Sequence, residues 1–156
     1  MAVEKMTRCT WCGDDPLYVS YHDNIWGRPE YDSKQLFEKL CLDGQQAGLS
    51  WITILRKRET MRAAFDGFQP EIIARYTDAD RERLLADPGI IRSKSKIEAA
   101  IGNAQAYLDM RERGIDFSDH LWSFVGGAPI QNAWPSLKDT PTKTAESEAL
   151  SKDLKK

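Results

Sequence analysis

The strongest constraint on the fold is a succession of helix-type segments that fills most of the sequence after residue 30. Apolar residues recur every three or four positions, and no long stretch alternates apolar and polar residues with the period of a strand. The segments are YDSKQLFEKLCL (31–42), GLSWITILRKRETMRAAF (48–65), QPEIIARY (69–76), TDADRERLLA (77–86), SKSKIEAAIGNAQAYLDMRERG (93–114), FSDHLWSFVGG (117–127) and TAESEALSKDLKK (144–156). The sequence therefore predicts an all-α fold.

Capping residues indicate where these helices begin. Thr77 is followed three residues later by Asp80, a loose form of the capping box with Asp in place of Glu. The stretch PLYVSY (16–21) precedes the helical series, and we expect it to form at most one short extended piece. The other expected N-terminal positions are Asp32 or Ser33, Ser50 and Pro70.

Length and charge exclude several classes of protein. A chain of 156 residues is enough for one domain or two small lobes. Its net charge of −2 argues against a protein that coats DNA nonspecifically, since such binding depends on a large positive excess. No apolar run approaches the ~20 residues that span a bilayer, and the start MAVEKMTRCTW lacks the apolar stretch of a secretory signal. We expect a cytoplasmic protein without a membrane partner.

The segment DPGIIRSKSKI (87–97) joins two predicted helices through a tight turn with several basic residues beside it. This pattern is typical of a helix-hairpin-helix element, here over about 78–113, in which backbone N–H groups and nearby cations contact a phosphate. The alternative is an ordinary helix connection with a solvated basic end. The candidate DNA-contacting residues are Gly89, Ile91, Arg92, Lys94 and Lys96.

A second unusual segment, CLDGQQAGLSW (41–51), interrupts a helix at Gly44 and again at Gly48. Asp43 at this break would suit a flat cationic aromatic ligand if large rings faced each other across a slot, because stacking and cation–π attraction would then act together. The alternative is a kinked helix pair with the rings in the core. The rings in question are Trp11, Tyr21, Trp26 and Trp51.

Three cysteines in a chain without a signal indicate free thiols or a metal site rather than a disulfide framework. Cys9, Cys12 and His22 have the spacing C-x2-C-x9-H, which supplies at most three of the four ligands of a structural zinc site. We expect His120 to face solvent on a short helix and Cys41 to be a small buried hydrophobe.

Four motifs together closely resemble the DNA-3-methyladenine glycosylase I family, in order and over essentially the whole chain. They are CTWCGDDPLYVSYHDNIWG (9–27), DSKQLFEKLCLDGQQAGLSWITILRKRE (32–59), GIIRSKSKIEAAIGNAQAYL (89–108) and LWSFV (121–125). The resemblance implies a helix-hairpin-helix DNA glycosylase fold of two small helical lobes, forming a single glycosylase domain over 1–156. It also implies a monomeric, monofunctional repair enzyme that excises 3-methyladenine from alkylated double-stranded DNA. Such an enzyme would act in the bacterial cytoplasm, reaching the nucleoid through its substrate.

The resemblance also assigns roles to individual residues. Trp51 would be a stacking wall for the base, with Trp11, Tyr18 and Trp26 as further aromatic surface. Tyr21 would hydrogen-bond the base and Asp43 would lie at its polar edge, so that these two residues carry the catalytic role. The DNA and zinc contacts implied by the family are Gly48 and Leu49, in the loop pressed into the duplex, and Cys9 and His22, as the first two of four ligands of a structural Zn²⁺.

The sequence departs from the family in three places. Asp43 stands where the family has Glu, and Ile25 stands where it has an acid. The family's last two zinc ligands, a His and a Cys, lie in a tail beyond LSKDLKK, so we expect an incomplete zinc site and a truncated chain.

The hairpin also lacks the catalytic Asp that other members of the superfamily carry there, and we expect no lysine Schiff base and no strand cleavage. Catalysis would depend on selective binding of a cationic base.

Three other functions remain open on the sequence alone. The first is a non-catalytic or impaired relative that binds damaged bases or DNA. The second is a hydrolase of glycosides that uses paired carboxylates such as Asp14, Asp15 or Glu38. The third is a purely structural helical module. We rank all three below the glycosylase.

Overall fold

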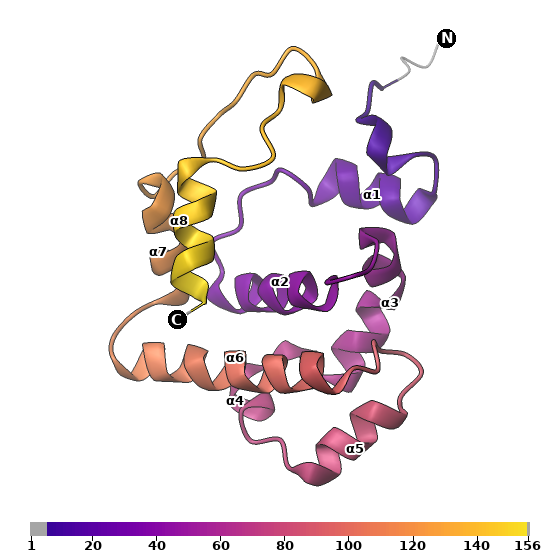
Figure 1. The fold of residues 1–156 in the computed structure, drawn as a ribbon, viewed down its shortest axis with the longest axis vertical. Coiled ribbons are helices and arrows are strands. Elements are labelled where there is room, and N and C mark those ends of the chain that lie inside the picture. The colour runs from indigo at the N-terminus through magenta and orange to yellow at the C-terminus, as the bar shows by residue number, and fades with distance from the viewer. Residues whose placement is uncertain (1–5, 156) are drawn as a thin grey trace.

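The computed structural model describes residues 6–155, and all regular secondary structure within them is helical (Figure 1), which confirms the all-α prediction. The α-helices are α1 (Pro16–Asn24), α2 (Ser33–Gln45), α3 (Trp51–Ala64), α4 (Pro70–Ile73), α5 (Asp78–Ala86), α6 (Lys94–Glu112), α7 (Phe117–Trp122) and α8 (Ala145–Leu154). Short 3₁₀ turns lie at η1 (Thr10–Cys12), η2 (Asp66–Phe68), η3 (Ser123–Val125) and η4 (Leu137–Asp139). No helix among the described residues is long and apolar enough to cross a bilayer.

Most of the predicted helix starts are confirmed. Asp32 caps α2 by accepting the amide of Gln35 at 2.9 Å. Thr77 and Asp80 form a capping box at the start of α5. Pro70 is the first residue of α4. Ser50 precedes α3 as expected, but its hydroxyl bonds the Thr53 hydroxyl at 2.8 Å instead of a backbone amide.

The expectation of an extended piece at PLYVSY is wrong, because these residues belong to α1. Asp15 accepts the amide of Leu17 at 2.9 Å, and Pro16 occupies the first helical position, so the helix has a strong start. Arg56 of α3 donates to Asp15 at 3.0 Å and ties the two helices together. These contacts override the strand preference of the aromatic and β-branched residues in this stretch.

The core lies between α2, α3, α4 and α6. In Figure 1 the long helix α6 crosses the molecule, with α2 on one side of it and α4 on the other. Phe37, Ile54, Met61 and Ile97 are among the side chains that pack here with almost no exposure. Cys41 is also in this cluster, and burial raises the pKa of its thiol to about 12, which confirms it as a buried hydrophobe.

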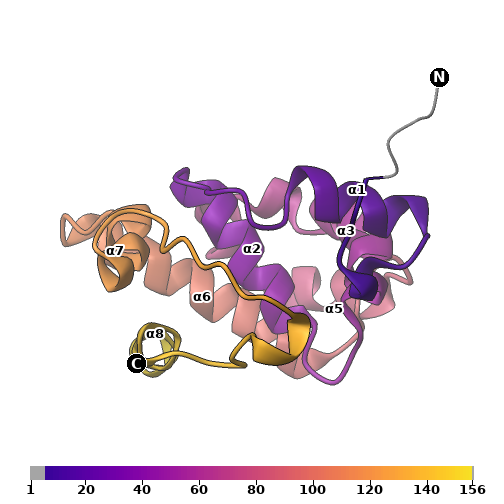
Figure 2. The same cartoon turned by 90° about the horizontal axis from the view of Figure 1, so that it is seen from above.

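The C-terminal elements form a separate edge of the molecule. Figure 2 shows α8 at this edge, away from α1 and α3. The ring of His120 in α7 lies 2.5 Å from a carboxylate oxygen of Asp153 in α8. His120 is half-buried at this helix contact, so the expectation that it faces solvent is wrong.

Helices α5 and α6, with the turn between them, have the order and extent expected for the helix-hairpin-helix element. The hairpin turn is fastened to α3. Lys57 donates to the carbonyl oxygen of Pro88 at 3.1 Å, and the Thr60 hydroxyl donates to that of Gly89 at 2.5 Å. The hairpin is therefore held against the helix that begins with Trp51. The division into two lobes and the extent of the single domain stay predictions.

Candidate functional site

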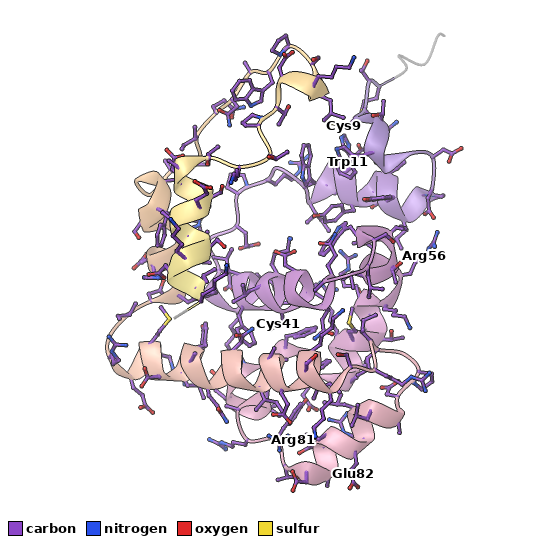
Figure 3. All side chains as sticks on the ribbon, in the orientation of Figure 1. Cys9, Trp11, Cys41, Arg56, Arg81 and Glu82 are labelled. Carbon is purple, nitrogen blue, oxygen red and sulfur yellow. The ribbon has the colours of Figure 1, made fainter. Side chains whose placement is uncertain are left out.

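One cleft, about 860 Å³ in volume, collects all six residues predicted to contact a base. The segment before α1, helix α1 and the turn that follows it contribute four of them, and the last turn of α2 and the first residue of α3 contribute the other two. Figure 3 shows Trp11 beside α1, on the same short segment as Cys9. The six residues are Trp11, Tyr18, Tyr21, Trp26, Asp43 and Trp51.

The rings in the cleft meet one another at an angle. The Trp11 and Trp26 centroids are 5.1 Å apart in an edge-on arrangement, and those of Tyr21 and Trp51 are 5.7 Å apart with the planes inclined by 52°. Trp26 is 49% exposed, although the His22 ring stacks against it at 5.6 Å. Inclined rings leave part of each face uncovered, so a flat aromatic ligand could stack there.

The carboxylate of Asp43 already has a cationic partner. Lys39, one turn earlier on α2, forms an ion pair with it. The Lys39 ammonium nitrogen also lies 4.6 Å from the centroid of a Trp51 ring, within the range of a cation–π contact. Lys39 thus contacts both groups that the sequence analysis assigned to a cationic ligand. Lys39 is outside the predicted site, although its i, i+4 spacing from Asp43 indicates this ion pair in the sequence.

Two hydrogen-bond donors, the Tyr21 O–H and the Trp51 N–H, lie in the aromatic part of the cleft. Burial raises the pKa of the Tyr21 phenol above its usual value, and the carboxylate of Asp43 raises it further, so the O–H stays protonated at neutral pH. The Nε1 atom of Trp51 is buried and has no hydrogen-bond partner among residues 6–155. Both groups are donors that a ligand with acceptor atoms could use.

Charged residues outside the predicted base-contacting set also line the cleft, among them Glu38, Arg58 and Arg62. Glu38 is buried, and its carboxylate accepts from Nε of Arg62 at 2.6 Å. Arg58 also lines the cleft, and its Nε is buried without a hydrogen-bond partner in the described part of the chain. Asp14 and Asp15 do not line the cleft. Of the three carboxylates named for the glycoside-hydrolase alternative, only Glu38 lines the cleft, and it is paired with Arg62, which weighs against that alternative.

The hairpin turn matches its predicted role only in part. The amide of Gly89 donates to the carboxylate of Asp87 at 2.7 Å, so a phosphate at this N–H would have to replace that carboxylate. Ile91 is half-buried. Arg92 and Lys94 are exposed and form no ion pair within residues 6–155. DNA contacts by Gly89, Ile91, Arg92 and Lys94 stay predictions.

Lys96 is placed differently from the other hairpin cations. Its ammonium group donates to the carbonyl oxygens of Gln45 at 2.8 Å and Ala47 at 2.7 Å. Gln45 is the last residue of α2, and Ala47 directly precedes Gly48 and Leu49. Gly48 has a φ of +78°, and Leu49 is 38% exposed. Lys96 therefore faces the loop between α2 and α3.

The predicted zinc ligands Cys9 and His22 lie close together. His22 Nε2 accepts the amide of Cys9 at 3.4 Å, and its Nδ1 lies 2.8 Å from a carboxylate oxygen of Asp23. The Arg8 guanidinium and, after it, the His22 ring lower the pKa of Asp23 to about 2. Cys12 is buried, with its thiol on the carbonyl of Cys9 at 3.1 Å.

No group of three or more potential ligands gathers anywhere in residues 6–155. A structural zinc ion takes four ligands. The described residues therefore do not fit a complete structural zinc site by themselves.

Comparison with known proteins places this chain in one family. The family model for methyladenine glycosylase matches residues 11–156. DNA-3-methyladenine glycosylase from Haemophilus influenzae is 54% identical over 150 residues, which cover 96% of this chain and 81% of that protein. DNA-3-methyladenine glycosylase 1 from Escherichia coli is 56% identical over 151 residues, with 97% and 81% covered.

Solved structures agree. A crystal structure of 3-methyladenine DNA glycosylase I superimposes with a TM-score of 0.93 at 54% identity, covering 96% of this chain and 82% of that one. A variant of 3-methyladenine DNA glycosylase I in complex with 3-methyladenine has a TM-score of 0.90 at 43% identity, covering 96% and 81%. The predicted helix-hairpin-helix glycosylase fold is therefore confirmed. The chain belongs to the methyladenine glycosylase family.

Proposed function

We propose that this protein is a DNA glycosylase that hydrolytically removes 3-methyladenine from alkylated DNA. The observation that carries the proposal is the cleft in which inclined aromatic rings lie beside the Asp43 carboxylate, in the last turn of α2. Relatives named for this activity share more than half of their aligned residues with the chain, and one structural neighbour holds 3-methyladenine.

The cleft suits this base because methylation at N3 gives adenine a positive charge while it is still attached to the sugar. Stacking on Trp51 contributes about 1–3 kcal/mol. The Asp43 carboxylate attracts the charge and accepts hydrogen bonds, while Tyr21 and the Trp51 N–H supply donors. The base must first leave the stack, at a cost of a few kcal/mol that is lowest for damaged bases.

Bond cleavage then needs little acid–base chemistry. The bond between C1′ and the base nitrogen breaks, its electron pair neutralises the charged base, and water adds to C1′ with loss of a proton. The cleft accelerates this step to the extent that it binds the transition state better than the substrate. We propose no lysine Schiff base and therefore no strand cleavage.

Contact with the duplex is assigned to two places. Arg92 and Lys94 would neutralise phosphates beside the hairpin, which gives an affinity that falls with salt. Gly48 and Leu49 would enter the duplex where the flipped nucleotide has left, since Leu49 is exposed on a short loop. We further propose that the protein acts as a monomer in the bacterial cytoplasm, and the bacterial origin of the relatives supports this location.

We also propose a structural zinc ion to which the described residues contribute two ligands. Cys9 and His22 would supply these two, and further ligands would have to come from elsewhere. The contact of His22 with Asp23 supports this role, because a carboxylate on one ring nitrogen commonly orients the other nitrogen toward a metal. Metal analysis of the purified chain tests it. About one zinc per chain, lost in a Cys9→Ser variant, is expected, and a metal-free folded protein would contradict it.

The central test is release of 3-methyladenine from methylated duplex DNA, measured by chromatography, with the Escherichia coli relative as positive control. Release that increases with enzyme and time, without strand cleavage, is the expected result. No release from a folded sample, while the control is active, would overturn the proposal.

A second candidate function is binding without excision. The observation that favours it is the engagement of Asp43 by Lys39 within the cleft. Under this alternative the protein binds 3-methyladenine and releases none from DNA, so the same assay combined with a binding titration separates the two.

A further inference from the structure

The side chain of Lys96, in α6, holds the loop between α2 and α3. Its ammonium group donates to two carbonyl oxygens, those of Gln45 and Ala47, at 2.8 and 2.7 Å. In return, the side-chain amide of the buried Gln45 donates to the carbonyl of Lys96 at 3.3 Å. The contact is thus reciprocal, and it joins two segments about fifty positions apart in the sequence.

The loop has little else to hold it. Ala47, Gly48 and Leu49 are all exposed. Within the described residues, every other hydrogen bond to the backbone of residues 46–49 comes from residues 42–49 themselves. The last carbonyls of a helix have no partner inside the helix and lie at the negative end of its dipole. A lysine ammonium, with three donors and a positive charge, stabilises that end well.

The position of this contact matters for the proposed function. Ala47 directly precedes Gly48 and Leu49, the residues expected to enter the duplex. Lys96 itself lies in the first turn of α6, two residues after Lys94, whose ammonium is expected to meet a phosphate. One side chain therefore connects the two parts of the protein that would contact DNA.

We infer that Lys96 is a positioning residue, which fixes the 46–49 loop relative to the hairpin so that Leu49 enters the duplex at the damaged nucleotide. Its effect on excision rests on the proposed function, whereas its effect on the loop does not. This role differs from the direct phosphate contact predicted from the sequence, because two donors of the ammonium group are already used inside the protein.

Hydrogen exchange in the free protein tests the effect on the loop. In Lys96→Met we expect the amides of Gln46, Ala47 and Leu49 to exchange at least tenfold faster, while amides in the middle of α6 keep their rates. Lys96→Arg restores most of the protection because a guanidinium can also donate to both carbonyls. The matched control is Lys34→Met on α2, an exposed lysine outside the cleft, which leaves loop exchange unchanged. Unchanged loop exchange in Lys96→Met would overturn the inference.

Single-turnover excision from saturating methylated duplex tests the consequence. We expect Lys96→Met to lower the rate about tenfold while the affinity for free 3-methyladenine stays within twofold. Leu49→Ala lowers the rate as well, and the double variant is no slower than the slower single variant, because both changes act through the same loop. Additive losses would contradict the inference.

The salt dependence of binding to undamaged duplex separates positioning from phosphate contact. We expect its slope to be the same in Lys96→Met as in the parent protein. A slope reduced by about one would instead show a direct phosphate contact and overturn the inference. If the parent protein releases no base, the proposed function fails, and the exchange measurement still decides the role of Lys96.

Discussion

The cleft and the hairpin turn differ in how their charges are used before any ligand arrives. In the cleft, Asp43 is paired with Lys39, and Glu38 with Arg62. At the hairpin, Arg92 and Lys94 are exposed and have no ion pair within the described residues. A ligand in the cleft must replace an internal cation, whereas a phosphate at the hairpin replaces only water and salt ions. The cleft is therefore suited to selection, and the hairpin to salt-dependent docking.

Among the variants that test this difference between the cleft and the hairpin, Trp51→Ala should have the largest effect. Loss of a stacking face costs about 1–3 kcal/mol per base, so binding of 3-methyladenine should weaken by about 5- to 150-fold. Affinity for undamaged duplex should change less than twofold. Tryptophan fluorescence and a duplex titration measure the two quantities. Trp134→Ala, which removes an exposed ring outside the cleft, is the control. Equal losses in both variants would remove Trp51 from the site.

Changes at Asp43 should have the next largest effect. Asn keeps the shape but removes the charge, and a hydrogen bond to a charged group contributes about 1.5–3 kcal/mol, so affinity for the base should fall roughly tenfold at this half-exposed position. Glu, the residue that the family resemblance implies for this position, should bind 3-methyladenine more tightly than Asp. Calorimetric titration of the three proteins gives the order, and equal affinities would mean that this carboxylate does not contact the base.

On the hairpin side, Lys94→Met should lower the slope of log affinity against log salt by about one and weaken duplex binding roughly fivefold at 0.1 M salt. Binding of free 3-methyladenine should not change, because Lys94 does not line the cleft. Anisotropy titrations at several salt concentrations measure the slope. An unchanged slope would mean that DNA does not contact Lys94, which would contradict the role of the hairpin in docking.

A smaller effect of opposite sign is expected from Lys39→Met. Removing the internal cation leaves Asp43 and the Trp51 face free, and an exposed cation–π contact is worth about 0.5–1 kcal/mol, so a cationic base should bind about threefold more tightly. A permanently charged probe, 3,9-dimethyladeninium, makes the measurement independent of ligand protonation. Lys34→Met serves as the charge-matched control. Weaker binding in Lys39→Met would mean that Lys39 supports the site instead of competing for it.

The smallest effect is expected at the ion pair between Arg8 and Asp23, which joins the segment that carries Trp11 to α1. The pKa of Asp23 is lowered to about 2 by Arg8 and, second, by His22. A carboxyl with a lowered pKa stabilises the folded state above its unfolded pKa of about 4, and this contribution is lost as pH falls from about 4 toward 2. In Arg8→Met the carboxyl resonance of Asp23 should titrate at higher pH, as followed by NMR. An unchanged midpoint would show that Arg8 does not hold this carboxylate.

Local signals in the sequence were sufficient for most of the fold. Asp32, Pro70 and the Thr77–Asp80 capping box act within one helical turn, so their effect is visible in a short stretch of sequence. Helix α1 was missed because its composition favours a strand, while its stability comes partly from the contact of Asp15 with Arg56, forty-one residues away.

The site was predictable where a motif names its residues and unpredictable where a distant side chain completes it. The six residues of the base-contacting set do line one cleft. The Lys96 ammonium points toward carbonyl oxygens of residues about fifty positions earlier in the sequence. The hydrogen bond of the Gly89 amide depends on the rotamer of Asp87. No periodicity in the sequence encodes either arrangement.

The assignment of the cleft as the base-binding site is tested most directly by a titration with 3-methyladenine. The titration is followed by NMR through the indole N–H signals of the five tryptophans. We expect the signal of Trp51 to shift most, those of Trp11 and Trp26 to shift as well, and that of Trp134 to stay in place. A titration that moves Trp134 and leaves Trp51 unchanged, or that moves none of the five, would contradict the assignment of the cleft as the base-binding site.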